Sequence, residues 1–359
     1  MAAMARGKNP AKQRTQKVSI ETVARAADVS IATVSRVINN SELVSPETGA
    51  RVRRAIDTLG FRPNRFAQGL MTRRSRVLGI SLPDVYGEFY SAIMRAADAR
   101  ARSHGYHLLV ATEPRRGDRA GEEFYMPLDL LDGLTLMITE PNERMLELAR
   151  RSSIPMVLVD ASPHDPMIDS VRIDNIEGTR EATRHLLASV APDRCYFVGG
   201  PAGNFDTIER SRAFLDVLGE KAGRAGGGQC TYGDYSLEWG HAWALRMVAE
   251  GRLVGAGVLA ANDWIAWGIM QGARESGVDV PRQLRVVGFD DTVLSTLVRP
   301  RLSTVHVPLG ELGSSAIDLL VRRIKDPGAA PLHVRLGTSL VVRETSIDER
   351  GAPGRPAPN

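Results

Sequence analysis

The pattern of apolar and polar positions along the chain changes character near residue 77. Before it, apolar residues recur at spacings of three and four, which is typical of short amphipathic helices. After it, runs of about five apolar residues alternate with helical stretches, a pattern typical of parallel strands covered on both faces. The sequence therefore predicts a small all-α head and an α/β body of two doubly wound parallel-sheet lobes.

The head is expected to hold three helices. The first is the stretch "SIETVARAA", whose leading serine can cap its first turn. After the tight connection "ADVS", a second helix capped by Ser30 turns Val34, Val37 and Ile38 to one side. A third helix begins at Pro46, a residue type favoured in a first helical turn. Two short helices, a tight turn and a supporting third helix predict a helix-turn-helix, although short helical pairs also occur in many bundles.

Charge is unevenly distributed between the head and the body. Over Met1–Arg76 there are about 15 Lys and Arg against about 5 Asp and Glu, a net charge of roughly +10. The whole chain carries +4, so the rest is mildly acidic. A basic head on an acidic body indicates a polyanionic partner at one end, and a solubilising tail is the alternative.

The head closely resembles the lactose-repressor family of bacterial transcription regulators. The stretches "DVSIATVSRVIN", "VSPETGARVRRAI" and "LGFRPNRFAQGL" carry the resemblance without a gap. It implies that the second helix lies in the major groove of double-stranded DNA, with Ile31 and Ala32 at the positions that vary with the operator. Arg36 would read a base, with guanine as its partner. The residues expected mainly to hold phosphates are Ser30, Thr33, Ser35 and Asn39.

Residues 65–76 are expected to link the head to the body. The segment is too short to form a stable helix alone, and a flexible linker is the simplest interpretation. The family resemblance implies instead a hinge helix that forms beside a second copy of the chain on DNA. In that case Leu70 enters the minor groove between base steps, with Ala67 on the same face and Asn64 as the cap.

The body resembles periplasmic sugar-binding proteins and the effector domain of the same family, and the resemblance covers nearly all of residues 18–345. It implies three crossings of the chain between two lobes. The expected divisions are a disordered basic tail (1–17), the helix-turn-helix domain (18–64), the hinge (65–76), an effector-binding and dimerisation domain (77–347) and a disordered tail (348–359). Within that domain, the expected lobes are 77–173 with 304–332, and 174–303 with 333–347.

The cleft between the lobes is the expected binding site, because ligands of such folds lie beyond the carboxyl ends of the strands. Polar residues that end strands and aromatic residues near them are the candidates. Carboxylates and an amide suit a hydroxyl-rich ligand, since they make several hydrogen bonds at once. The effector-binding residues that the family resemblance implies are Phe89, Tyr90, Asp160, Tyr235, Asn262 and Asp290. Trp264, which follows the stretch "AND", is expected to close the cleft, and packing in the core is the alternative for the aromatic residues.

One position departs from the family pattern as we count it. Relatives place a ligand-binding arginine six positions before an aromatic residue, and counting back from Phe214 gives Ile208. Arg210 lies two positions further on and is expected to face elsewhere. An apolar residue at this place weakens the interpretation of a free sugar as the effector, and leaves a modified sugar, an oligosaccharide or another metabolite open.

Other classes of protein find less support. No apolar run is long enough to span a bilayer, and no secretory signal precedes the head, which disfavours an exported transport protein and a membrane partner. Cys195 and Cys230 suggest a reducing compartment, so we expect a cytoplasmic, nucleoid-associated protein. No metal spacing, cofactor motif or catalytic motif occurs, and no enzyme activity is expected.

Together these features predict a ligand-responsive repressor of catabolic or transport genes. It would bind a palindromic DNA operator as a homodimer under the control of a small sugar-like effector.

Overall fold

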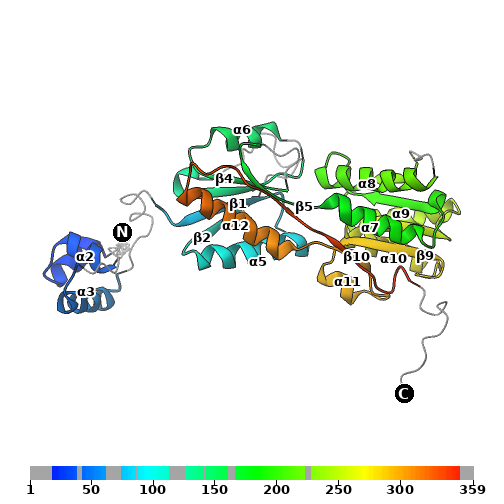
Figure 1. The fold of residues 1–359 in the computed structure, drawn as a ribbon. Helices are drawn as coiled ribbons and strands as arrows, with labels where there is room; N and C mark the ends of the chain where they lie inside the picture. The colour runs from blue at the N-terminus through cyan, green and yellow to red at the C-terminus, as the bar shows by residue number, and fades with distance from the viewer. Residues whose placement is uncertain are drawn as a thin grey trace, which may run out of the picture. The chain divides into compact units, whose positions relative to one another are not determined.

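The computed structural model (Figure 1) describes residues 18–38, 43–61, 74–85, 87–112, 126–140, 142–160, 166–222 and 228–347. The chain divides into two compact units, Met1–Ser75 and Arg76–Asn359, which are described separately. The described part of the first unit is helical, and the second holds two largely parallel sheets. The predicted combination of an all-α head and a two-lobed α/β body is confirmed.

The head consists of three helices, α1 (Ile20–Ala26), α2 (Ile31–Ile38) and α3 (Pro46–Leu59). They pack around one small core, and its buried residues are Val23, Ala24, Ala27, Val34, Val37 and Val52. The guanidinium Nε of Arg51 donates a hydrogen bond of 2.9 Å to the carbonyl of Ala27, which ties α3 to the turn after α1. The turn itself places Asp28 at φ 49°, a left-handed conformation that Asp tolerates better than most residues.

The ends of the head helices follow the sequence closely. The Oγ of Ser19 accepts the Thr22 amide and that of Ser30 accepts the Thr33 amide, at 3.3 and 3.1 Å. Gly60 ends α3 in the left-handed conformation at φ 61°. Each serine cap accepts an amide that has no partner within its helix, and Gly60 supplies the left-handed conformation that ends α3. Residues at the helix ends therefore set the helix boundaries.

The first lobe of the body contains a six-stranded parallel sheet. In spatial order its strands are β11 (His333–Leu336), β5 (Asp169–Ile173), β4 (Met156–Val159), β3 (Gly133–Met137), β1 (Val77–Leu82) and β2 (His107–Thr112). Its helices are α5 (Gly87–Ser103), α6 (Glu143–Arg151), α12 (Leu309–Lys325) and the short η1 (Leu128–Leu130). Figure 1 shows α5 and α12 on one face of this sheet and α6 on the other.

The second lobe repeats this plan. Its strands in spatial order are β12 (Ser339–Val341), β10 (Ser303–His306), β9 (Leu284–Asp290), β8 (Ala256–Ala260), β6 (Cys195–Gly199) and β7 (Cys230–Tyr232). Only β12 runs antiparallel within this sheet. Its helices are α7 (Asn175–Leu187), α8 (Phe205–Ala222), α9 (Leu237–Ala249), α10 (Asp263–Glu275), α11 (Val293–Leu297) and the short η2 (Pro192–Arg194).

Close helix contacts depend on glycine. A Cβ added at Gly268 of α10 would lie 2.0 Å from the carbonyl oxygen of Leu237 in α9, and one at Gly240 would lie 2.1 Å from the Ile265 oxygen. In the first lobe, a Cβ at Gly313 of α12 would lie 2.3 Å from the Ile93 oxygen in α5. Backbone approaches of this kind exclude any side chain, so both helix pairs are fixed by sequence.

The structure corrects the predicted lobe boundaries at two strands. Three crossings occur, after β5, after β10 and after β11. However, β10 lies beside β9 in the second lobe, where we had expected residues from 304 onward to join the first. Conversely, β11 pairs with β5 in the first lobe, where we had expected the chain from 333 onward to lie in the second. Both strands lie at a crossing and have only four residues, so their pattern carries no information on which sheet receives them.

Candidate functional site

The outward face of α2 is the candidate surface of the head. Val34 and Val37 are buried, whereas Ala32 and Arg36 are exposed and Ile31 is 47% exposed. An exposed isoleucine and an exposed arginine on one capped helix provide an apolar contact and a long cationic donor. These are the groups that contact a thymine methyl and the acceptors of guanine.

The beginning of α2 is fixed by side chains that we also assigned to phosphate contacts. The hydroxyls of Ser30 and Thr33 lie 2.9 Å apart, and Ser30 caps the helix. Thr33 and Ser35 are partly exposed. Asn39 of the same set, and the hinge residues Asn64, Ala67 and Leu70, lie outside the described residues.

The candidate site of the body is a cavity of about 90 Å³ between the lobes, here named the ligand cleft. Its walls come from the first turn of α5, the end of β3, the start of α8, the loop before α9 and the ends of β8 and β9. The lining residues are Phe89, Tyr90, Met137, Thr139, Asn204, Asp206, Arg210, Tyr235, Asn262 and Asp290. Five of the seven predicted effector residues are therefore brought together in one cavity.

Arg210 is the centre of the polar wall. It is 2% exposed; its Nε donates to Asn175 Oδ1 at 2.8 Å, and its Nη1 donates to the Ala261 carbonyl at 2.5 Å. Its guanidinium lies over the ring of Phe289, 3.7 Å from the centroid. Burial alone would lower the pKa of Arg210, but Asp206, whose carboxylate lies 3.6 Å away, raises it. The arginine is thus held rigidly and stays charged.

A second set of hydrogen bonds holds the aromatic ring of Tyr235. Its hydroxyl donates to Asn204 Oδ1 at 2.8 Å and lies 2.8 Å from the Thr207 hydroxyl. The same Asn204 oxygen accepts the Thr207 amide at 3.1 Å, close to the start of α8. Burial raises the pKa of Tyr235, so the ring is present as a neutral phenol.

Asp160 lies at the edge of the cleft rather than in its lining. It lines a smaller cavity with Asp206, which also lines the cleft, so the two cavities adjoin. Asp160 is 4% exposed. Burial, and then the nearby Asp206, raise its pKa well above the usual value. Burial likewise raises the pKa of Asp290, at the end of β9.

Asn262 and Trp264 occupy different environments. Asn262 lines the cleft, and its Oδ1 caps α10 by accepting the Ile265 amide at 2.8 Å. Trp264 does not line the cleft: it is 39% exposed and packs on Trp267 with ring centroids 5.6 Å apart. The expectation that Trp264 closes the cleft is therefore wrong. Trp264 lies two residues after the cap Asn262, and this rotation turns its side chain to the outside of α10.

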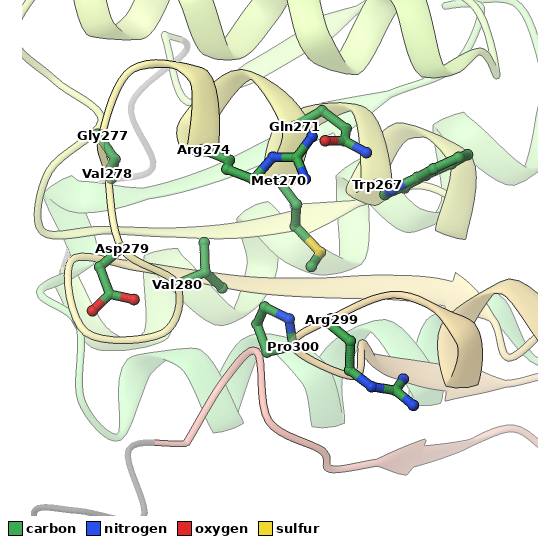
Figure 2. A pocket seen from close by; sticks show the side chains of 10 residues that line it. All are labelled: Trp267, Met270, Gln271, Arg274, Gly277, Val278, Asp279, Val280, Arg299 and Pro300. Atoms are coloured by element: carbon green, nitrogen blue, oxygen red, sulfur yellow. The ribbon is translucent and has the colours of Figure 1, made fainter.

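Another hollow, of about 390 Å³, lies along α10 (Figure 2). Trp267, Met270, Gln271 and Arg274 of α10 line it together with the loop that carries Pro300. This α10 hollow and the ligand cleft share no lining residue, so they are separate.

The structure reverses our expectation for Ile208 and Arg210. Arg210 and Phe214 are four residues apart on α8 and share its buried face, whereas Ile208 is 45% exposed. Positions i and i+4 lie one above the other on a helix, so the arginine must be counted four residues before the aromatic, not six. The cleft therefore does contain an arginine, and the argument against a sugar that depended on Ile208 no longer holds.

Sequence reasoning missed half of the cleft's lining. The missed residues are Met137, Thr139, Asn204, Asp206 and Arg210. A usable signal was present in Asp206 and Arg210, which are four apart at the start of a helix that follows a strand end. Thr139 likewise follows the buried strand β3.

Contacts between the lobes border the cleft. The amide of Phe205 donates to the Thr139 carbonyl at 2.8 Å, and the amide of Val293 donates to Glu88 Oε2 at 2.8 Å. Arg172 and Glu209 form an ion pair of 3.5 Å beside the smaller cavity. Each of these bonds joins one lobe to the other.

A search of the described residues for a helix that could cross a membrane finds none that is long and apolar enough.

Comparisons with known proteins agree with this geometry. Residues 19–64 match the family described as bacterial regulatory proteins, lacI family, and residues 183–346 match the periplasmic binding protein-like domain. Among solved structures, a Lac repressor dimer bound to operator and the anti-inducer ONPF is 26% identical with a TM-score of 0.82, covering 93% of this chain and 100% of that one. A complex of the transcriptional regulator CelR with cellobiose is 28% identical with a TM-score of 0.67, covering 91% and 99%.

Curated relatives are similar over nearly their whole length. Catabolite control protein A of Staphylococcus aureus is 32% identical over 330 residues, which cover 92% of this chain and 99% of that protein. The HTH-type transcriptional regulator RegA of Clostridium saccharobutylicum is 30% identical over 333 residues, with the same coverage. With the helix-turn-helix head and the two-lobed body in place, this similarity shows that the chain belongs to the lacI family of bacterial regulatory proteins and is a transcriptional regulator.

Proposed function

We propose that this regulator is a repressor of catabolic or transport genes that binds a palindromic operator as a homodimer and is controlled by a small hydroxyl-rich effector. The observation that carries the proposal is the presence, in one chain, of an exposed DNA-reading helix face and a buried polar cleft between two lobes. Such a protein works where the chromosome is, in the bacterial cytoplasm.

In this proposal α2 reads the operator with few base contacts. Ile31 and Ala32 can contact a thymine methyl but cannot donate a pair of hydrogen bonds. Arg36 is then the main base-reading residue, and the remaining specificity comes from the shape and deformability of the DNA. A two-fold dimer would place two copies of α2 in successive major grooves, hence the palindrome.

Exposed apolar side chains in the second lobe support the homodimer. In α11, Val293 is exposed and Leu297 is 69% exposed, and α11 contacts α10, which carries Trp264 and Trp267 on its outer side. Large apolar groups grouped on adjacent helices are typical of a protein–protein interface. We expect a second copy to cover them.

The narrow cleft supports control by an effector. Pockets for small molecules are commonly several hundred Å³ (roughly 300–1,000 Å³), whereas this one is about 90 Å³. An effector of the size of a sugar would have to change the spacing of the lobes, and with it bonds such as that between Glu88 and the Val293 amide. The lobe spacing is thus the two-state element that a ligand can bias.

A DNA-binding selection followed by a mobility-shift assay tests the proposal. Full-length protein should enrich a palindromic sequence from a random duplex library. On that sequence Arg36→Ala should weaken binding by about tenfold to a hundredfold, the effect of losing one base-reading arginine. Arg25→Ala, which removes the same charge from an exposed position of α1, is the matched control and should change affinity much less. Enrichment of no sequence, or equal losses for both variants, would refute the proposal.

A further inference from the structure

Two carboxyl groups from opposite lobes meet in the smaller cavity that adjoins the ligand cleft. Asp160 follows β4 in the first lobe, and Asp206 lies in the first turn of α8 in the second. Both side chains are buried and line this cavity, and their carboxyl groups are hydrogen-bonded to each other. A hydrogen bond between two carboxyl groups needs a proton on one of them, because an ionised carboxylate only accepts. This contact between the lobes therefore exists only while a proton is bound.

The surroundings of the pair place the proton on Asp160. Asp206 accepts a hydrogen bond from Asn175 Nδ2 at 2.8 Å and lies 3.6 Å from the guanidinium of Arg210, and both donors belong to its own lobe. These donors favour a negative charge on Asp206 whether or not the lobes touch. Burial, and then Asp206, raise the pKa of Asp160, although Arg210 and the Ile173 amide act in the opposite direction. Asp160 is therefore the neutral acid that donates to Asp206.

The two arginines near Asp160 are already paired with other groups. Arg172 of β5 lines the same cavity, but it forms an ion pair of 3.5 Å with Glu209 of α8. Arg210 faces Asp206 with one nitrogen and donates with its other two to groups of the second lobe. An ionised Asp160 would thus have to share a cation that another carboxylate already uses.

Two further titratable groups face Asp160 from other elements, and both oppose its ionisation. The charge of Asp160 raises the pKa of Asp290, at the end of β9, and that of Tyr90, in α5. Neither group is a cation in any protonation state, so neither offers Asp160 a counter-charge. The form in which Asp160 and Asp206 meet, here named the closed form, is therefore built to hold a proton.

Separation of the lobes changes the surroundings of Asp160 completely. It then exchanges Asp206 for water, in which such a carboxyl group ionises with a pKa of about 4. We infer that closure of the lobes takes up one proton from solvent, held between Asp160 and Asp206, so that acid favours the closed form and a higher pH favours the open one. The inference rests on the proposed function, because it names a regulation of the same cleft. An effector that needs a wider cleft competes with this proton.

The direction of the pH dependence follows from which form binds the proton more tightly. At about pH 4 and below, both forms hold the proton, and the ratio of closed to open molecules is at its highest. Above that pH, only the closed form still holds it, so each pH unit should lower the ratio by up to about tenfold. The decline ends where Asp160 ionises in the closed form as well.

Energy transfer between two dyes, one on each lobe, measures the separation of the lobes without DNA or effector. The dyes are attached to cysteines that replace two exposed residues, Arg151 at the end of α6 and Asp216 on α8. Cys230, which is partly exposed, is replaced by serine, and labelled chains are mixed with an excess of unlabelled chain so that transfer occurs within one chain. We expect the transfer efficiency to change reversibly between about pH 5 and 8. An efficiency that does not vary with pH would overturn the inference.

Three variants of the labelled chain show whether Asp160 and Asp206 hold the proton. Asp160→Asn, whose amide can donate to Asp206 at any pH, should keep the low-pH efficiency throughout. Asp206→Asn, whose amide can donate to an ionised Asp160, should also lose the pH dependence. Glu209→Gln is the matched control: it breaks the ion pair between the lobes with Arg172 three residues along the same helix, and should shift the efficiency but preserve its change with pH. A pH dependence that persists in Asp160→Asn, or that disappears in Glu209→Gln, would place the proton elsewhere and refute the inference.

A parallel measurement distinguishes this inference from the proposed function. Operator binding by the unlabelled chain is measured over the same pH series. A chain that enriches no operator refutes the proposed function, whereas the separation of the lobes, which requires neither DNA nor effector, tests the proton alone.

Discussion

The two walls of the ligand cleft are built on different principles. The first lobe offers mainly Phe89, Tyr90 and Met137, and among the described residues no side-chain hydrogen bond of these three is found. The second lobe offers Arg210 and Tyr235, each tied to several partners before any ligand arrives. The comparison suggests that the second lobe recognises the polar groups of the ligand, while the first lobe covers it and reports its presence by moving.

The largest effect is expected at the centre of the polar wall. Arg210→Leu leaves the carboxyl groups of Asp206, Asp160 and Asp290 without their cation, so the free energy of unfolding of the body should fall by about 3–5 kcal/mol. Urea denaturation followed by circular dichroism measures the loss. The double variant Arg210→Leu with Asp206→Asn should recover part of it, because one uncompensated charge is gone. A loss below about 1 kcal/mol in the single variant would contradict the central role of Arg210.

A pH-dependent effect is expected from Asp263, the buried acid beneath the polar wall. Its carboxyl accepts hydrogen bonds from the amide and hydroxyl of Thr292 and from the hydroxyl of Thr304, at 2.6–2.9 Å. Burial nevertheless raises its pKa to about 7. The folded chain thus binds this proton more tightly than the unfolded chain, so the contribution to stability is complete at low pH.

That contribution should be lost as the pH rises through 7. Between about pH 4 and 7, the free energy of unfolding should decline by up to about 1.4 kcal/mol per pH unit from this group, and above this range the decline should stop. Asp263→Asn should flatten the profile of unfolding free energy against pH. The opposite result is an unfolding free energy of the wild type that rises with pH over this range and is the same in the variant. It would show that the hydrogen bonds to Asp263 lower its pKa by more than burial raises it.

The two tyrosines of the cleft give a direct comparison of its walls. Tyr235→Phe removes a hydroxyl bonded to Asn204 and Thr207, and should cost about 1 kcal/mol of unfolding free energy. The Tyr90 hydroxyl has no hydrogen-bond partner among the described residues. Tyr90→Phe should therefore change the free energy of unfolding by less than about 0.5 kcal/mol. Thermal or urea unfolding of both variants measures the difference. Similar losses would mean that the first lobe is organised as tightly as the second.

The sequence predicts the architecture better than it predicts the chain's path between lobes. Strands such as β6 and β8 are uninterrupted buried runs, so their place in a covered parallel sheet follows from composition alone. By contrast, β7 and β12 have three residues each, and β10 and β11 join the sheet opposite to the one expected. Membership of a sheet is decided by tertiary pairing, which short local patterns do not record.

The sequence predicts correctly those cleft residues that are polar and directly follow a buried strand. Asn262 and Asp290 directly follow buried strands, and both line the cleft. Arg210 was misplaced because its position on α8 depends on helical phase, and a count that is wrong by two residues moves a side chain across the helix. Asp160 is intermediate: it follows β4 as expected, but opens onto the adjoining cavity.

The smallest effect is expected at Trp264, which its position after the stretch "AND" predicted at the cleft and which the structure places outside the cleft lining. Trp264→Ala should leave the affinity for a sugar that binds in the cleft within about twofold of wild type, since distant surface changes rarely exceed about 0.5 kcal/mol. Calorimetric titration of the variant measures it, with Tyr235→Ala as the positive control. A tenfold loss at Trp264 would mean that ligand binding draws α10 into the cleft, and the second lobe would then be a moving wall rather than a preorganised one.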